Sequence, residues 1–283
     1  RPPDRHVRAL PRSPLFVTGA CLVVCVVSVA LLAPALSPFD PRTLSGDALE
    51  PPSARHLLGT NDIGQDIASQ VIWGARTSLA LAVGAAALSV VIGFVVGVSA
   101  GAVGGTYDTV LMRVVDVALA TPRLPLLVLV AALAGAGRTT LIVLIGLITC
   151  AVPTRVLRSE VLILRRRGFV EAARGFGAGL PHVAHRHFLP ALGPLLVSHL
   201  VLIAGTAVLL EAELAFLGLS DPTAMSWGLM LNRGVRETGL YFTSAWAWLL
   251  LPAGFALTIA VLGFAFLGVG LEPFLNPRAA KGR

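Results

Sequence analysis

The sequence predicts an all-α integral membrane protein with six transmembrane helices. Hydrophobic residues make up 55% of the chain and charged residues only 13%, about half the charged fraction of a soluble globular domain. The apolar residues form long continuous runs, whereas the strands of a membrane β-barrel alternate apolar and polar residues, so helices are expected. A chain of 283 residues has room for six helices of about 20 residues, the length that crosses a hydrocarbon core of about 30 Å.

The first expected transmembrane helix spans 15–36 and follows a cytoplasmic tail at 1–14. This uncharged run is longer than the apolar core of a cleaved signal peptide, so we expect it to be retained. Pro34 and two further prolines up to position 41 break the apolar pattern. Residues 37–74 are predicted to form a polar extracytoplasmic segment.

Five further helices are expected within a core at 75–271. This core contains a cytoplasmic loop at 157–189 and an extracytoplasmic loop at 213–244, and a cytoplasmic tail follows at 272–283. The apolar runs that give the five helices are 77–101, 108–134, 139–156, 190–210 and 245–271.

The distribution of basic residues predicts that both termini are cytoplasmic. Six crossings place the termini and the 157–189 loop on one side, and fourteen basic residues then lie inside against six outside. This bias follows the positive-inside rule. The inner set is Arg1, Arg5, Arg8, Arg12, Arg155, Arg158, Arg165, Arg166, Arg167, Arg174, Arg186, Arg278, Lys281 and Arg283; the outer set is Arg42, Arg55, Arg76, Arg138, Arg233 and Arg236.

The composition argues against several functional classes. The formal net charge of +7 does not indicate a nucleic-acid partner, because the basic residues stand beside apolar runs and not among stacking aromatics. Lys281 is the single lysine. Because a P-loop needs a lysine inside a glycine-rich loop, this chain is not itself a P-loop ATPase. No motif for a catalytic serine or a zinc protease is present in the sequence.

The cysteines and histidines do not indicate a metal site. The three cysteines at 21, 25 and 150 lie in apolar runs and are expected to be thiols that face lipid or are packed within the protein. His182 and His185 could share a helix face near His187, but no third ligand is fixed beside them. Solvated histidines are therefore favoured over metal binding, and we expect no catalytic, cofactor or metal site in this chain.

Glycines recur at every fourth position of the second run. Gly93, Gly97, Gly101 and Gly105 repeat the GxxxG spacing, which forms a groove where another helix can approach closely. The series predicts a tight helix contact, either within this chain or with a partner.

Two groups of charged residues within apolar runs have alternative interpretations. Arg113, Asp116 and Arg123 interrupt the third run; a helix that starts late, near the inner headgroups, is favoured over a polar lining of a translocation path. Glu211 and Glu213 end the fifth run. A helix end near the outer interface is favoured over proton coupling.

The stretch 169–190 is a cationic, glycine-interrupted segment between two apolar runs. Residues 170–176 favour a helix, Gly177 and Gly179 permit a sharp turn into a second short helix, and Pro190 suits the first turn of the next span. From the residues alone, a helix–turn–helix that a partner can grip and an ordinary loop are equally supported.

The same stretch resembles the EAA loop of binding-protein-dependent ABC importer permeases. The resemblance lies in Glu171-Ala172-Ala173, Gly177 and Leu189-Pro190, whereas His187 stands where the family usually has isoleucine. In that family the loop forms a coupling helix that docks in a cleft of the ATP-binding subunit. The resemblance therefore implies that these six residues couple the chain to an ATPase.

Further motifs are similar to the dipeptide, oligopeptide and nickel subfamily and cover nearly the whole chain. Gln65 stands where arginine is common in that subfamily, and Asn276 where aspartate is usual. The matching strings are His56-x-Leu58-Gly59-Thr60-Asn61-x-x-Gly64-Gln65-Asp66, Gly74-Ala75-Arg76-x-Ser78-Leu79, Gly104-Gly105-x-x-Asp108, Met112-Arg113-x-x-Asp116, Phe216-Leu217-Gly218-Leu219, Ser226-Trp227-Gly228-x-Met230-Leu231, Gly268-x-Gly270-Leu271 and Asn276-Pro277-Arg278.

The resemblance implies a pore subunit in a bacterial cytoplasmic (inner) membrane. Its expected partners are a non-identical sister permease, two ATP-binding subunits that hold ATP and Mg²⁺, and an extracytoplasmic solute-binding protein. Peptides are the first expected substrate and nickel chelates the second. A secondary transporter is a rival, but such folds typically show inverted repeats, and we find no convincing repeat in this sequence. A structural membrane protein without a partner ATPase is the other rival.

Overall fold

The computed structural model describes residues 13–135 and 137–275. The tail at 1–12 and the Asn276-Pro277-Arg278 motif lie outside the described residues. Within the described ranges the chain is all-α and contains no β-strand, only an isolated bridge between Thr60 and Asp66. The predicted all-α class is confirmed.

Four helical segments are long and apolar enough to cross a membrane, and two bent helix pairs raise the number of crossings to six if each pair counts once. The long helices are α1 (Pro14–Leu31), α3 (Ile67–Val103), α10 (Leu189–Phe216) and α13 (Leu251–Leu275). The bent pairs are α4 (Gly105–Ala120) with α5 (Arg123–Ala134), at 93°, and α6 (Arg138–Thr149) with α7 (Ala151–Leu164), at 44°. The short elements are α2 (Ala33–Leu36), α8 (Gly168–Gly175), α9 (Leu180–Val183), a π-helical turn (Ala184–Phe188), α11 (Trp227–Arg236), a 3₁₀ turn (Leu240–Phe242) and α12 (Ala245–Leu249).

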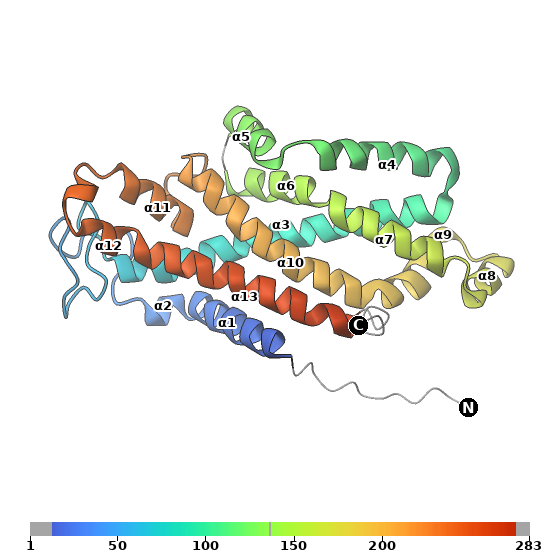
Figure 1. The fold of residues 1–283 in the computed structure, drawn as a ribbon, viewed down its shortest axis with the longest axis horizontal. Coiled ribbons are helices and arrows are strands. Elements are labelled where there is room, and N and C mark those ends of the chain that lie inside the picture. The colour runs from blue at the N-terminus through green and yellow to red at the C-terminus, as the bar shows by residue number, and fades with distance from the viewer. Residues whose placement is uncertain (1–12, 136, 276–283) are drawn as a thin grey trace.

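The long helices run along one axis and give the bundle two distinct ends (Figure 1). Helices α8 and α9 lie at one end, on the right of the view, and α11 and α12 lie at the other. The start of α1 and the end of α13 point toward the α8–α9 end, whereas the segment between α2 and α3 lies at the α11–α12 end. This is the arrangement that six crossings with both termini on one side produce; the orientation in the membrane stays a prediction.

The core lies where α3, α6, α10 and α13 meet. Small side chains dominate it: Ala82, Ala85 and Ala207 are fully buried. Alanine and glycine let helix backbones approach closely, which matters in lipid because apolar side chains gain little from leaving it. Outward-facing residues such as Val91 and Val95 are more than half exposed, as expected of a lipid-facing surface.

Helix α3 begins ten residues before the expected run, at Ile67. Asp66 is its N-cap, and its Oδ2 accepts a hydrogen bond of 2.7 Å from the Ser69 backbone N–H. Such a cap satisfies one of the free N–H groups at a helix start. Residues 67–74 are therefore helical and do not extend the polar segment.

The run at 108–134 is not one straight helix. Thr121 precedes Pro122 and has an extended ψ of 131°. Proline causes this, because it disfavours the helical region for the residue before it. Helix α4 ends there and α5 restarts at Arg123, nearly at right angles. The next run continues to Leu164, so the expected loop at 157–189 begins with two further helical turns.

Two other expected boundaries shift. The first span is interrupted at Leu32, before Pro34, which divides it into α1 and α2. Helix α10 continues to Phe216, so Glu211 lies inside the helix with only 2% of its surface exposed. Glu211 and Glu213 lie shortly before the end of α10, and Glu211 is buried there instead of ending the helix. The expected loop at 213–244 also contains α11, and Trp227 at its start is buried.

Candidate functional site

Helices α8 and α9 form a short hairpin at one end of the bundle. Glu171, Ala172 and Ala173 lie in α8, whose acidic first turn suits the positive end of the helix dipole. Gly177 follows α8 with a φ of +83°, a conformation that glycine adopts without a Cβ penalty. Pro181 then occupies the first turn of α9. The helix–turn–helix expected from the sequence is present.

The hairpin is fixed to the bundle by a small hydrophobic cluster separate from the main core. Val170 from α8, Val183 from α9 and Phe188 from the π-helical turn are fully buried in it. Around them pack residues of three long helices. These are Val98 and Ala102 of α3, Leu157 and Val161 of α7, and Leu192 of α10.

Two arginines tie the same region to the end of α3. Arg165 Nη1 donates to the Gly101 carbonyl oxygen at 3.0 Å, and Arg174 Nη2 donates to the Ala102 carbonyl oxygen at 3.4 Å. The last carbonyls of a helix lack intrahelical partners, and cations are favourable there. The hairpin is thus joined to the ends of α3, α7 and α10 by this cluster and to α3 also by two hydrogen bonds.

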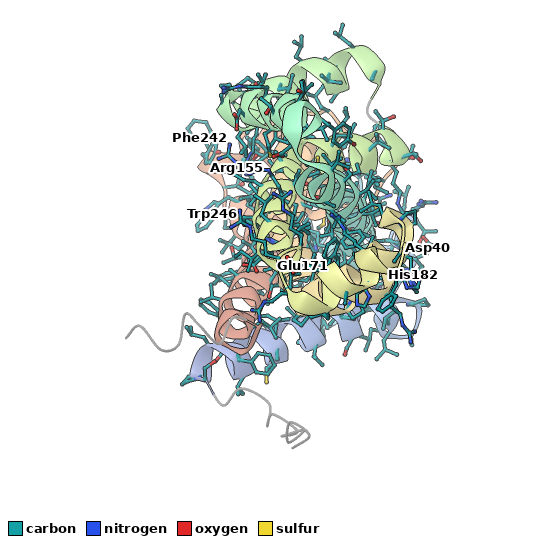
Figure 2. All side chains as sticks on the ribbon, turned by 90° about the vertical axis from the view of Figure 1, so that its right-hand side faces the viewer. Asp40, Arg155, Glu171, His182, Phe242 and Trp246 are labelled. Atoms are coloured by element: carbon teal, nitrogen blue, oxygen red, sulfur yellow. The ribbon has the colours of Figure 1, made fainter. Side chains whose placement is uncertain are left out.

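The outer surface of the hairpin is open. Glu171, Ala172 and Gly177 are exposed, and Ala173 is half-buried. Figure 2 looks at this end of the bundle and shows Glu171 on α8 and His182 on α9. Leu189 and Pro190, at the start of α10, are also exposed. All six residues expected to contact an ATPase therefore belong to one end of the molecule.

The tip of the hairpin carries a residue that the sequence reasoning did not single out. Phe176 follows α8 and is 94% exposed. Single exposed apolar residues are common on protein surfaces, but at the tip of an anchored hairpin this side chain offers an apolar contact to a partner. The signal was present in the sequence, because Phe176 is the one aromatic residue flanked by glycines on both sides, Gly175 and Gly177.

The histidines of this end do not form a metal site. The rings of His182 and His187 have centroids 6.3 Å apart, at an edge-on angle. Among the described residues no group of three or more His, Cys, Asp or Glu side chains is placed to hold a metal ion.

Three of the four spaced glycines lie against α7 in this chain. A Cβ added to Gly93 would lie 3.0 Å from the Pro153 side chain, one on Gly97 2.6 Å from the Thr154 carbonyl oxygen, and one on Gly101 2.9 Å from Val161 Cγ1. Only glycine permits this approach.

Gly105 differs from its expected role. It starts α4 with a φ of +64°, and a Cβ there would meet no heavy atom of the described residues within 4 Å. Together with Gly104, which also has a positive φ, Gly105 turns the chain from α3 into α4. Gly105 takes no part in the contact with α7, because α3 ends at Val103, before this position.

Two ion pairs join α4 to α7. Asp108 accepts two hydrogen bonds from Arg158, of 2.6 and 2.5 Å, and Asp116 pairs with Arg155. Arg113, three residues before Asp116, lies 3.7 Å from the same carboxylate. The sequence suggested only the Arg113–Asp116 pair, because residues 39 and 50 positions apart give no local pattern.

We expect Asp108 and Arg158 to stabilise the fold jointly. Asp108→Asn and Arg158→Gln should each lower the free energy of unfolding, since the Asp108 side chain is only 12% exposed and each change leaves a buried polar group unpaired. The double variant should cost less than the sum of the two, by about 0.5–3 kcal/mol. Unfolding of the purified chain in detergent measures this; strictly additive losses would count against the pair.

Comparison with known proteins agrees with this geometry. The family described as binding-protein-dependent transport system inner membrane component matches residues 89–281, and the N-terminal transmembrane domain of oligopeptide transport permease C matches residues 5–52. A putative peptide permease protein of Brucella suis biovar 1 is 39% identical over 266 residues, 93% of this chain and 87% of the relative. The probable D,D-dipeptide transport system permease protein DdpC of Escherichia coli K12 is 32% identical over 273 residues, 95% of this chain and 90% of that protein. The chain belongs to the family of binding-protein-dependent transport system inner membrane components.

Proposed function

We propose that this chain is a translocation subunit of an ATP-driven importer of di- or oligopeptides and that a separate ATPase moves it through the α8–α9 hairpin. Members of the family are non-catalytic, multi-pass subunits that work with ATPase and substrate-binding partners. We further propose a sister permease, two ATPase subunits that hold ATP and Mg²⁺, and an orientation with both termini and the hairpin in the cytoplasm of a bacterium.

One observation carries the coupling role. The hairpin buries Val170 and Val183 in a cluster shared with α3, α7 and α10, while Phe176 at its tip stays 94% exposed. A segment that is anchored inward and carries an exposed aromatic side chain at its tip, beside the exposed charges of Glu171 and Arg174, is suited to being held by another protein. The comparably exposed aromatic Phe242 belongs to the 3₁₀ turn between α11 and α12, at the opposite end of the bundle (Figure 1).

The mechanism follows from that anchorage. When the ATPase subunits close on ATP, the hairpin they hold moves, and the shared cluster passes the displacement to three long helices. A packed cluster transmits strain because protein interiors are close-packed. ATP shifts the equilibrium between inward- and outward-facing states only because its subunits bind the two states differently.

The peptide substrate is supported by the relatives. The Brucella suis protein is described as a putative peptide permease, and the Escherichia coli protein as a probable D,D-dipeptide permease. Both align with more than nine-tenths of this chain.

Reconstitution tests the proposal. With the sister permease, ATPase subunits and binding protein in proteoliposomes, we expect ATP-dependent uptake of short peptides. Glu171→Lys reverses an exposed charge, and Gly177→Leu forces a bulky side chain into a backbone conformation with φ of +83°, which costs about 1–3 kcal/mol. Both variants should lose transport, with impaired assembly or ATPase coupling. Transport and ATPase activity that are unchanged by both substitutions would sink the coupling role.

A further inference from the structure

A cavity of about 700 Å³ opens at the α11–α12 end of the bundle. It lies between α3, α6 and α10, with walls from the loops around residues 40–42 and 220–225. Volumes of about 300–1,000 Å³ are typical of small-molecule sites. Its side on α3 runs from Trp73 to Leu81, about 12 Å along the helix, which equals three to four residues of extended peptide.

Three arginines and three carboxyl groups line this cavity. The arginines are Arg42, Arg76 and Arg138, and the carboxyl groups belong to Asp40, Asp221 and Glu211. Such a mixed lining does not suit a purely apolar or purely anionic ligand, because either would leave charges of one sign without a partner.

Arg76 and Arg138 face the cavity without a carboxylate partner. Neither forms a salt bridge with any carboxylate of the described residues. Arg76 lies over the ring of Trp73, with its Cζ 5.5 Å from the ring centroid, a contact that orients a guanidinium and leaves its N–H groups free to donate. Two guanidinium groups from different helices provide donors for a carboxylate.

The third arginine, Arg42, lies near Asp40 and Asp221 but forms no salt bridge with either. Asp221 accepts hydrogen bonds from the Thr223 hydroxyl and backbone N–H, at 2.7 and 2.8 Å, and these bonds together with nearby Arg42 hold the pKa of Asp221 below its usual value. Asp40 accepts a hydrogen bond from the Arg42 backbone N–H at 2.8 Å. Asp40 and Asp221 are therefore both held by hydrogen bonds within the loops, whereas Arg76 and Arg138 stand on helices α3 and α6.

Within the described part of the chain, Glu211 is a carboxyl group without a cationic partner, whereas Arg76 and Arg138 are cations without a carboxylate partner. It is 98% buried at the wall of the cavity, and its Oε2 accepts a 3.0 Å hydrogen bond from the Ser78 hydroxyl, yet no cation of the described residues pairs with it. Ser220 Oγ, which lines the same cavity, is buried and has no hydrogen-bond partner among the described residues. Buried groups of this kind are normally paired, so a ligand that brings a cation would complete this wall.

We propose that the cavity is a subsite for a short zwitterionic peptide, with the terminal carboxylate on Arg76 and Arg138 and the terminal ammonium on Glu211. This inference rests on the proposed function and deepens it. Selection for free termini is then built into the permease itself. The cavity length limits the bound portion to about three or four residues.

Direct binding tests the subsite. Radiolabelled trialanine is titrated onto the assembled permease–ATPase complex in nanodiscs without the binding protein, beside C-amidated and N-acetylated trialanine. The Arg76→Gln/Arg138→Gln variant should weaken trialanine binding at least about tenfold and leave the affinity for the amide unchanged, because the amide has no carboxylate to lose. Glu211→Gln should weaken trialanine to the same degree and leave the N-acetyl peptide unchanged.

Matched controls separate the subsite from general damage. Arg55→Gln removes an exposed cation at the same end, and Glu213→Gln removes a carboxylate two residues along α10; neither residue lines the cavity. Both controls should bind trialanine like wild type. The subsite is refuted if the complex binds no trialanine, if the cavity variants match the controls, or if they weaken all three peptides equally.

Uptake measurements distinguish failure of the subsite from failure of the proposed function. If the wild-type transporter with its binding protein imports trialanine but the cavity variants bind and import it normally, the subsite is wrong and the proposed function stands. If the wild type imports no peptide, the proposed function fails and the subsite fails with it.

Discussion

Replacing Phe176 with aspartate is expected to abolish ATP-driven transport while leaving the fold intact. The side chain is 94% exposed, so its loss removes almost no packing within the chain. In the complex it would be a central apolar anchor, and such residues typically contribute about 2 kcal/mol or more to binding. We expect the ATPase subunits to bind about 30-fold more weakly, and a negative charge in an apolar cleft adds to the loss.

Phe242 provides the matched control. It is also 94% exposed, but it lies in the 3₁₀ turn between α11 and α12, at the opposite end of the bundle (Figure 1). Phe242→Asp should leave recovery of the ATPase subunits with the tagged permease unchanged. If both aspartate variants recover ATPase subunits like wild type, the hairpin tip is not the contact.

Replacing Gly97 with alanine is expected to destabilise the bundle. A Cβ at this position would lie 2.6 Å from the Thr154 carbonyl oxygen, and that oxygen is backbone and cannot rotate away. Helices α3 and α7 must move apart, and overpacking of this kind costs about 1–3 kcal/mol. The thermal midpoint of the purified protein should fall by several degrees.

Gly193 is the corresponding control in α10. A Cβ there would meet no heavy atom of the described residues within 4 Å. Gly193→Ala should be neutral or stabilise by up to about 1 kcal/mol, since alanine is the better helix former. A Gly97→Ala variant as stable as Gly193→Ala would show that the close approach to α7 is not required.

The local patterns in the sequence predicted the parts of the fold that depend on neighbours along the chain. The apolar runs located the long helices, and Gly177 with Pro190 located the turn and the next helix start, because these residues restrict the backbone by themselves. The break at Thr121–Pro122 has a local signal of the same kind, because proline disfavours a helical conformation of the residue before it, but the hydropathy of the run is continuous across the proline and predicts one span.

Features that depend on contacts between distant parts of the chain could not be predicted from the sequence. Val170 and Val183 look like ordinary residues of a loop until α3 and α7 are placed beside them. Glu211 looked like a helix end because two carboxylates follow an apolar run, and only the placement of Ser78 gives it a buried partner. The cavity that joins Glu211 to Arg138 likewise depends on three helices at once.

Peptide accumulation in proteoliposomes, with and without the ATPase subunits, tests the central claim most directly. The same permease pair and binding protein are used in both preparations, with ATP at the face that carries the α8–α9 hairpin. The account predicts accumulation only when the ATPase subunits and ATP are present, and none when Phe176 is aspartate. Accumulation driven by a proton gradient without the ATPase subunits would contradict it and identify a secondary transporter instead.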